Sequence, residues 1–338
     1  MTKGSNLLTI VLLIISLFWG VLLFLESYKA QSEISGILLA QSTIKPHFRR
    51  ELKSTTLIFS GDIVLDRGVE VAVEKYGHGD YRFPFFEIGS QLNEADILFG
   101  NLEGPISSRG RKVGSIYSFR IDPKAIDGLL FAGFDVLSVA NNHIFDYGKD
   151  AMEDTFQYLK LAGIDYVGGG FSEQEAYEPR IKEIEGTKIA FLAYTNLGSL
   201  YWAAQGNGSG IAWLEKEKMV EGIRLAKDKA DVVIVSFHYG NEYQTQPDNT
   251  QIFLSQTAIE EGADLIIGHH PHVVQPIEEY KTGFIAYSLG NFVFDQSFSE
   301  QTMRGLLLKV IIKNKKIEKI VPIEVEINDF FQPTITQQ

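Results

Sequence analysis

Three of the chain's seven histidines stand together at the end of an apolar run, where residues 265–272 read Leu-Ile-Ile-Gly-His-His-Pro-His. His270 and His272 are two residues apart, so in an extended chain their side chains would share one face. Neutral imidazole is the commonest metal ligand in proteins. The spacing therefore predicts that these two histidines bind one metal ion, or two ions held close together.

Polar residues follow several other apolar runs in the same way. They are Asp62; Asn101 and Glu103; Asn141, Asn142, His143 and Asp146; His238, Asn241 and Glu242; and Asn291. Taken alone, a histidine after an apolar strand is more often a core residue, and an Asn-Asn pair is more often a turn. The coincidence of so many polar strand ends favours a shared site, because buried polar groups are costly unless they bind something. Imidazole, carboxylate and amide together suit a divalent transition metal such as Mn, Fe or Zn.

Strands and helices alternate along the part of the chain that carries these residues. Amphipathic helices are predicted over 123–134, 149–163, 216–230 and 251–262, and hairpins over 178–196 and 306–327. The alternation predicts an α/β fold with a largely parallel sheet covered on both faces. The hairpins favour a mixed sheet or a two-sheet sandwich between helices. Ligands of such sheets collect beyond the carboxyl ends of the strands, which is where the polar residues stand.

The composition narrows the class of function. The 338-residue chain has a net charge of −12, which argues against nucleic acid as a partner. The absence of cysteine excludes disulfides, thiolate metal ligands and cysteine nucleophiles. Five lysines between residues 309 and 319 alternate with apolar residues, so this run is interpreted as a solvated hairpin face rather than a binding patch.

The N-terminal region carries nineteen consecutive uncharged residues, Leu7 to Leu25. At about 1.5 Å per residue such a helix nearly spans a bilayer core of roughly 30 Å, and no Ala-x-Ala-like cleavage site follows it. The sequence therefore predicts a cytoplasmic tail over 1–6, a retained transmembrane signal anchor over 7–25 and a stalk over 26–54. A globular domain over 55–327 and a C-terminal tail over 328–338 are expected outside the cell membrane, which the chain would cross once.

Six motifs follow one another along the chain: Gly-Asp (61–62), Asn-x-Glu-Gly (101–104), Ala-Asn-Asn-His-x-x-Asp-Tyr-Gly (140–148), His-Tyr-Gly-x-Glu (238–242), Gly-His-His-Pro-His (268–272) and Ser-Leu-Gly-Asn-Phe (288–292). Their order resembles the CapA/PgsA family of poly-γ-glutamate capsule synthesis proteins, a branch of the calcineurin-like metallophosphoesterases. The resemblance extends from about Thr55 to Val325. It implies a metallophosphoesterase-like four-layer α/β sandwich with mixed sheets, here preceded by the single transmembrane helix.

The same resemblance implies a role for each matching residue. The implied metal ligands are Asp62, Glu103, Asn142, His238, His270 and His272. Glu103 would bridge two ions, and His143 would assist the leaving group of a phosphoester. The superfamily usually begins Asp-x-His, but Val64 stands where that histidine is expected, so one metal position lacks a ligand. The candidates for substrate binding are Arg67, Asn101 and Asn291, with a second group of cations at Arg109, Arg111, Lys112 and Arg120.

The resemblance leaves two functions open. In the first, the protein is a membrane-anchored, extracytoplasmic accessory of poly-γ-glutamate synthesis or export, working with other subunits of a membrane polymer synthase and contacting the anionic polymer. In the alternative, it is a two-metal phosphoesterase that acts on a phosphate-bearing substrate at the cell surface. Both readings expect two divalent transition-metal ions. Because the chain is acidic, contact with a polyanion requires local cations or bound metal.

Overall fold

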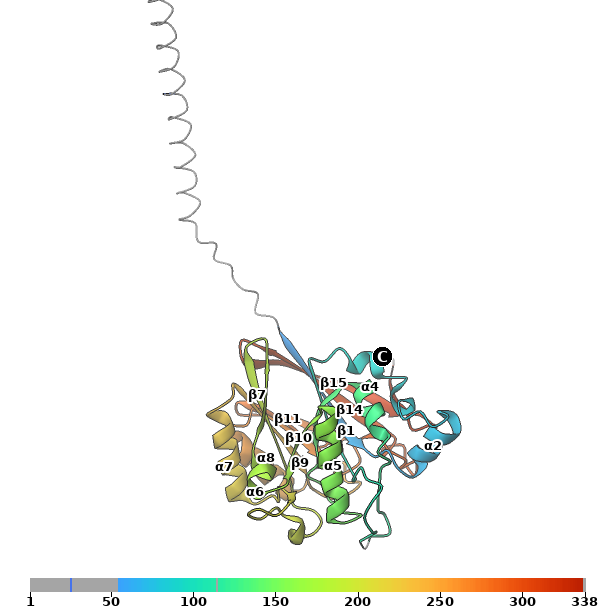
Figure 1. Cartoon of the computed structure of the whole chain (residues 1–338). Coiled ribbons are helices and arrows are strands. Elements are labelled where there is room, and N and C mark those ends of the chain that lie inside the picture. The colour runs from blue at the N-terminus through green and yellow to red at the C-terminus, as the bar shows by residue number, and fades with distance from the viewer. Residues whose placement is uncertain (1–24, 26–53, 114, 337–338) are drawn as a thin grey trace, which may run out of the picture. The chain divides into compact units, whose positions relative to one another are not determined.

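The computed structural model describes residues 25, 54–113 and 115–336 (Figure 1). The chain divides into two compact units, Met1–Glu51 and Leu52–Gln338. The predicted tail, transmembrane anchor and stalk lie outside the described residues, apart from Leu25 and Ser54. Within the described part of the chain, none of the helices combines the length and the apolar character that a membrane crossing requires. The described residues from 54 onward belong to the second unit.

The first of two large sheets has eight strands. They are β1 (Thr55–Ile63), β2 (Ile97–Leu102), β3 (Phe134–Ser138), β4 (Asp165–Val167), β13 (Asn291–Val293), β14 (Arg304–Lys313), β15 (Lys316–Ile327) and β16 (Pro333–Ile335). The order is β16-β15-β14-β1-β2-β3-β4, and β13 pairs with β1. β1 runs parallel to β2 and antiparallel to β14, so the sheet is mixed. β16 lies within the predicted C-terminal tail but pairs with β15, so the sheet continues beyond residue 327.

The second sheet has six strands, ordered β11-β12-β10-β9-β7-β6. They are β6 (Arg180–Ile184), β7 (Thr187–Thr195), β9 (Val232–His238), β10 (Leu265–His269), β11 (Ile277–Tyr280) and β12 (Gly283–Ala286). The central strands are parallel, and antiparallel hairpins close both edges. Every residue of β9 is buried, as its Val- and Ile-rich sequence predicts for a strand covered on both faces. A small separate sheet pairs β5 (Gly169–Gly170) with β8 (Gly210–Ile211).

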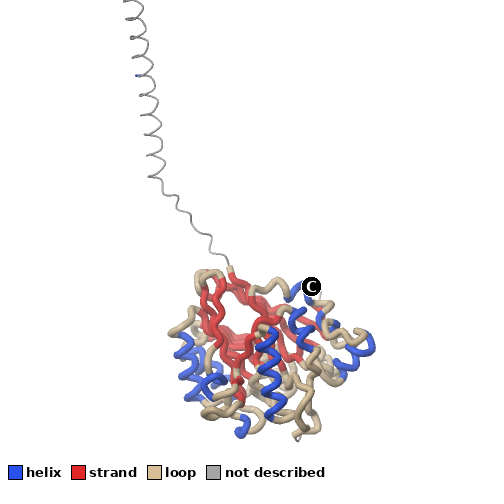
Figure 2. Tube along the Cα trace, viewed as in Figure 1, coloured by secondary structure: helices blue, strands red, loops and turns tan. Residues whose placement is uncertain are grey.

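Helices cover the outer face of each sheet (Figure 2). α2 (Gly68–Tyr76), α4 (Ala125–Ala132) and α5 (Lys149–Ala162) pack on the first sheet, and α7 (Lys216–Lys227) and α8 (Asn249–Glu260) pack on the second. The short elements are η1 (Phe83–Phe85), α3 (Gly89–Leu92), α6 (Glu173–Tyr177) and η2 (Leu200–Trp202). Four of the long helices lie where the sequence predicts them. α4 and α5 each end at a glycine in the left-handed conformation, which side chains with a Cβ rarely adopt.

A third apolar cluster fills the space between the two sheets. It contains Phe59 and Phe99 from the first sheet and Phe191 and Ile234 from the second. The rings of Phe99 and Phe191 stack with centroids 5.8 Å apart. The layers are therefore helix, sheet, sheet and helix, so the two-sheet sandwich is the correct alternative. A single sheet with helices on both faces is not what forms.

Candidate metal centre

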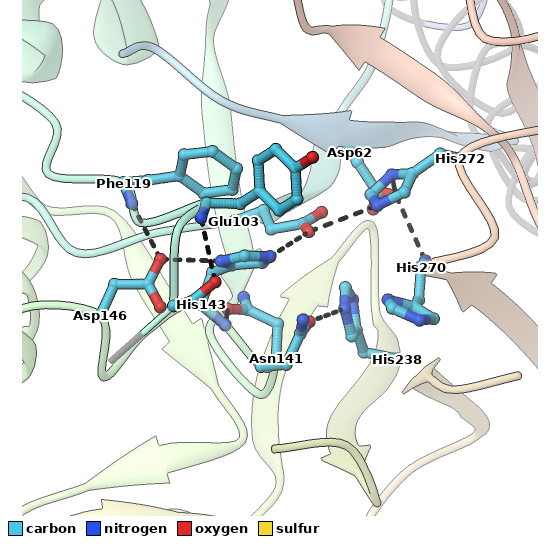
Figure 3. A network of polar contacts seen from close by, with 12 residues as sticks. Asp62, Glu103, Phe119, Asn141, His143, Asp146, His238, His270 and His272 are labelled. Atoms are coloured by element: carbon cyan, nitrogen blue, oxygen red, sulfur yellow. Dashed lines mark hydrogen bonds and ion pairs between the residues drawn. The ribbon is translucent and has the colours of Figure 1, made fainter. Parts of the chain in front are cut away.

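The structure gathers the predicted polar residues beyond the carboxyl ends of parallel strands from both sheets (Figure 3). Asp62 and Glu103 stand at the ends of β1 and β2, and His143 follows β3. His238 is the last residue of β9, and His270 follows β10. Because the two sheets face each other, the strand ends of both contribute side chains to one site.

The spacing of His270 and His272 predicted that they lie on an extended strand, and this prediction is wrong. β10 ends at His269, and His270 and His272 have φ angles of 95° and 58°. These positive angles are rare for residues with a Cβ, and they persist where surrounding contacts fix them, often at functional sites. Here the His270 N–H donates to Asp62 Oδ2 at 3.2 Å. The turn thereby holds both imidazoles against the end of β1.

Two sets of three side chains place their ligand atoms within 4.8 Å of one another. The first set is Asp62, Glu103 and His238, and the second is Glu242, His270 and His272. The first set is fully buried, and in the second only Glu242 is exposed. The two sets are adjacent, since the His272 Nε2 lies 3.8 Å from the Glu103 Oε1 and the rings of His238 and His270 are 4.9 Å apart.

Asn142, the remaining predicted ligand, contacts the first set. Its Oδ1 lies 2.7 Å from the Nε2 of His238. The amide oxygen and the imidazole nitrogen are therefore close enough to bind one cation together. All six predicted ligands thus lie in one cluster, and the structure adds Glu242, which the sequence marked as a polar strand end without a role.

The buried atoms of the site fit a divalent cation. Among the described residues, Glu103 Oε1 and His270 Nδ1 are buried without a hydrogen-bond partner. A buried acceptor that binds nothing costs on the order of 1–3 kcal/mol, and native proteins contain few such atoms. Carboxylate, imidazole and amide ligands converge here without a thiolate, a combination that suits Mn, Fe or Zn.

The shifted pKa values of the predicted ligands also fit a bound cation. Burial raises the pKa of Glu103 well above its usual range, and the charge of Asp62 raises it further. Burial also lowers the pKa of His238 well below its usual range and, with the charge of His272, lowers the pKa of His270 to about 3. Burial opposes ionisation of Asp62, yet His269 and His272 beside it hold its pKa well below the usual range. His238 and His270 are therefore neutral imidazoles, the form that binds metal.

Asn101 and Asn291, predicted to bind substrate, are fully buried and hydrogen-bonded to ligand side chains. Asn101 donates to Asp62 Oδ1 at 2.8 Å and accepts from Asn141 at 3.2 Å. Asn291 Oδ1 lies 3.1 Å from His272 Nδ1. The His269 Nδ1, which sequence reasoning gave no role, lies 3.1 Å from Asp62 Oδ1. Asn101, Asn291 and His269 are therefore placed to orient the metal ligands that they contact. Loss of such an orienting residue commonly changes metal affinity 10- to 100-fold.

His143 forms a pair with Asp146. Its Nδ1 lies 2.7 Å from Asp146 Oδ2, an oxygen that also accepts the Phe119 N–H at 2.8 Å. Its Nε2 faces Glu103, 3.7 Å from Oε1 (Figure 3). The carboxylate fixes the ring so that the second nitrogen points into the site, the arrangement of an oriented general acid or base. Asp146 stands three residues after His143, which was the sequence signal for it.

A pocket of about 400 Å³ opens above the centre. Asn142, His143 and His272 line it beside Arg67 and Glu242. Its aromatic lining residues are Tyr117, Phe119, Tyr243, Phe294 and Phe298. These rings come from three distant segments of the chain, so no local pattern in the sequence could predict this lining.

The predicted cations offer little free positive charge to this pocket. Arg67 forms an ion pair with Asp295, and its guanidinium stacks 4.8 Å from the Phe119 ring. Arg109 forms an ion pair with Asp154. Arg120 lies over the Tyr147 ring at 4.5 Å. Of the predicted cations, only Arg67 lines the pocket.

Comparison with known proteins identifies relatives of the part of the chain that carries the site. Residues 56–296 match the family model of the bacterial capsule synthesis protein PGA_cap. The chain is 32% identical over 293 residues to the capsule biosynthesis protein CapA of Bacillus anthracis, covering 84% of this chain and 70% of that protein. It is 34% identical over 259 residues to the PGA biosynthesis protein CapA of Bacillus subtilis, covering 76% and 67%.

Among solved structures, the chain is similar to a phosphatase from Mycoplasma pneumoniae, with 16% identity and a TM-score of 0.47 over 81% of this chain and 94% of that one. A TM-score below 0.5 does not establish a common fold. The family model, in contrast, covers every strand end that builds the centre, from Asp62 to His272. This model and the two Bacillus relatives confirm the resemblance seen in the motifs: the chain belongs to the family of PGA_cap bacterial capsule synthesis proteins.

Proposed function

We propose that this protein acts in the synthesis or export of poly-γ-glutamate, as a membrane-anchored extracytoplasmic accessory with a metal-dependent site. The family match carries this proposal, because residues 56–296 include every predicted ligand from Asp62 to His272. Two Bacillus relatives are named for capsule or PGA biosynthesis. The anchor is supported by the uncharged run from Leu7 to Leu25. Other subunits of a membrane polymer synthase are the expected partners.

The metal is central to this role because the pocket itself is acidic. Glu242 and Asp295 line it, and Arg67 is paired with Asp295. A polyanion would meet repulsion there unless divalent cations supply positive charge. Asp62, Glu103, Asn142, His238, His270 and His272 would hold two such ions, with Glu103 between them.

A second candidate, hydrolysis of a phosphoester, is favoured by the His143–Asp146 pair. Two divalent ions in this site would polarise a phosphoryl oxygen and activate water. When both nitrogens of His143 carry protons, Nδ1 donates to Asp146 and Nε2 can give its proton to a leaving oxygen in the pocket.

Polymer production tests the proposal. In a polymer-producing host that lacks its own copy, the full-length wild-type chain should restore cell-associated γ-linked glutamate. His238→Ala should not restore it at equal protein level, because the first ligand set loses its imidazole. Glu217→Gln, an exposed change on α7, is the control and should restore it fully. Normal polymer with His238→Ala would refute the dependence on the metal site, and no restoration by the wild type would refute the role in polymer production.

A further inference from the structure

The carboxylate of Glu242 lies beside two of the imidazoles of the centre. Its ligand oxygen and the ring nitrogens of His270 and His272 are all within 4.8 Å of one another. We propose that Glu242 is a metal ligand and that it compensates for the donor absent at Val64 by adding a carboxylate to the His270–His272 side of the centre. This inference rests on the proposed metal centre and adds to it one residue, from a different strand end.

The side chain of Val64 has no atom that can bind a metal, and neither have the side chains of Phe119 and Phe294 that pack against it. Val64 is fully buried and packs in a small apolar cluster with these two rings. The Phe294 ring lies 5.1 Å from the ring of His272. The Phe294 side of the His272 ring is therefore apolar, and a further ligand has to approach from another direction.

The loop after β9 provides that direction. Tyr243, the residue after Glu242, donates its N–H to the carbonyl of Pro271 at 2.8 Å, within the His270–His272 turn. The preceding residue, Asn241, donates to Asp248 at the start of α8, at 2.9 Å. Both neighbours of Glu242 are thus tied down, one of them to the turn that carries the histidines. The position of the carboxylate beside those rings is a consequence of this backbone.

The backbone of the loop requires a glycine at position 240. Gly240 has a φ of 88°, and a Cβ there would lie 2.5 Å from the side chain of Gln251. Tyr243 has a φ of 63°. Two positive φ angles around Glu242 bend the chain back over the end of β10. The bend returns the chain to the histidine turn at Tyr243, five residues after His238.

The chemistry of the site gives Glu242 a use that a surface carboxylate lacks. Asp62 and Glu103 already place two carboxyl groups in the centre, and Glu242 adds a third at its open side. Negative charge on neighbouring carboxylates is unfavourable unless a proton or a cation offsets it. Arg67, the cation that lines the same pocket, is engaged by Asp295. A divalent ion held by Glu242, His270 and His272 would offset this negative charge.

Two properties follow for this ion. Because Glu242 is exposed while Asp62, Glu103 and His238 are fully buried, the ion at Glu242 should exchange faster than the ion at the buried set. A carboxylate in place of an imidazole also makes the set of ligands harder, in the sense of hard and soft Lewis bases, and a harder set favours Mn²⁺.

The test measures bound metal and needs no activity. The full-length chain is stripped with a chelator and titrated with Mn²⁺, and bound ions are counted by elemental analysis and by electron paramagnetic resonance. The wild type should bind two ions, the second more weakly. Glu242→Gln should keep the first ion and weaken the second by ~10-fold or more, with loss of the spin coupling between them. Glu242→Asp should recover part of that affinity.

Asp295→Asn is the matched control, because it removes one carboxylate from the same pocket outside both ligand sets. It should leave the second ion bound. Equal weakening by Asp295→Asn and Glu242→Gln would show that only the charge of the pocket matters and would overturn the inference. Unchanged binding in Glu242→Gln would overturn it as well. A wild type that binds no Mn²⁺, Fe²⁺ or Zn²⁺ would instead remove the metal centre on which the inference rests.

Discussion

The Asp146 carboxylate holds the ring of His143 from the side opposite the metal ligands. The two are joined by a 2.7 Å contact between His143 Nδ1 and Asp146 Oδ2, while His143 Nε2 faces Glu103 at 3.7 Å. His143 lies in the pocket but belongs to neither ligand set. Its imidazole is therefore free for proton transfer, and its removal separates the two candidate functions.

His143→Ala should leave metal content and folding unchanged. If the protein hydrolyses a phosphoester, the turnover of that ester should fall about 10²–10⁴-fold, the usual contribution of a positioned acid or base. If the role is accessory, polymer yield at equal protein level should not change. Polymer collapse with metal retained would favour catalysis. Asp146→Asn, which keeps the ring but loses the carboxylate charge, should give a smaller loss in the same assay.

Most of the fold could be predicted from local patterns. Runs such as Val232–Val235, which are apolar and β-branched, indicate buried strands, and the Gly133 and Gly163 positions mark helix ends. Local patterns could not predict the pairing of strands into two sheets, because it depends on contacts such as that between Phe99 and Phe191, far apart in the chain. Only the resemblance of the motifs implies the four-layer sandwich. Alternation of strands and helices is common to one-sheet and two-sheet folds.

The candidate site divides in the same way. Residue type and position at the end of an apolar run identified the polar residues of the site, including Glu103 and His238. The backbone conformation of the His270–His272 turn could not be predicted, since positive φ at a histidine has no marker in residue type. The roles of Asn101 and Asn291 depend on hydrogen bonds to side chains on other strands, so the sequence indicated polar residues without showing what they contact.

Removal of metal should destabilise the fold. A ligand that binds only the folded state adds about 2.7 kcal/mol at 100-fold excess over its dissociation constant. For a domain of this size, that corresponds to a Tm change on the order of 5 °C. Differential scanning calorimetry of the chain before and after chelation checks this. His238→Ala should show a much smaller response to added Mn²⁺, whereas Glu217→Gln should respond as the wild type does. Equal responses in all three would contradict a metal at these ligands.

The N-terminal segment should remain in the mature protein and leave residues 55–338 outside the cell. The uncharged run from Leu7 to Leu25 without a small-x-small cleavage site is the reason. Protease added to intact protoplasts should digest the domain, while a cytoplasmic marker protein stays intact. Protection of the domain would contradict the orientation. A mature N-terminus after Ala30 or Ala40 would contradict retention of the anchor.

Glu103 should make the metal-free protein less stable as the pH rises. Burial raises the pKa of this carboxyl in the folded state well above the value in the unfolded chain, so the folded state binds the proton more tightly. The stabilisation is therefore complete below the unfolded pKa, near 4.5, and is lost as the pH rises toward the folded pKa. The slope cannot exceed about 1.4 kcal/mol per pH unit for one proton.

Glu103→Gln cannot ionise and isolates this effect. His238 and His270 act in the opposite sense, because their lowered pKa values make stability rise as the pH passes the usual histidine range. They are present in both proteins, so their contribution cancels in the difference. The free energy of unfolding of metal-free wild type, measured by urea titration from pH 5 to 8, should fall relative to that of Glu103→Gln as the pH increases. Parallel curves for the two proteins would show that Glu103 does not carry a raised pKa. Added Mn²⁺ should reverse the trend in the wild type, because a bound cation favours the ionised carboxylate and its binding releases the proton.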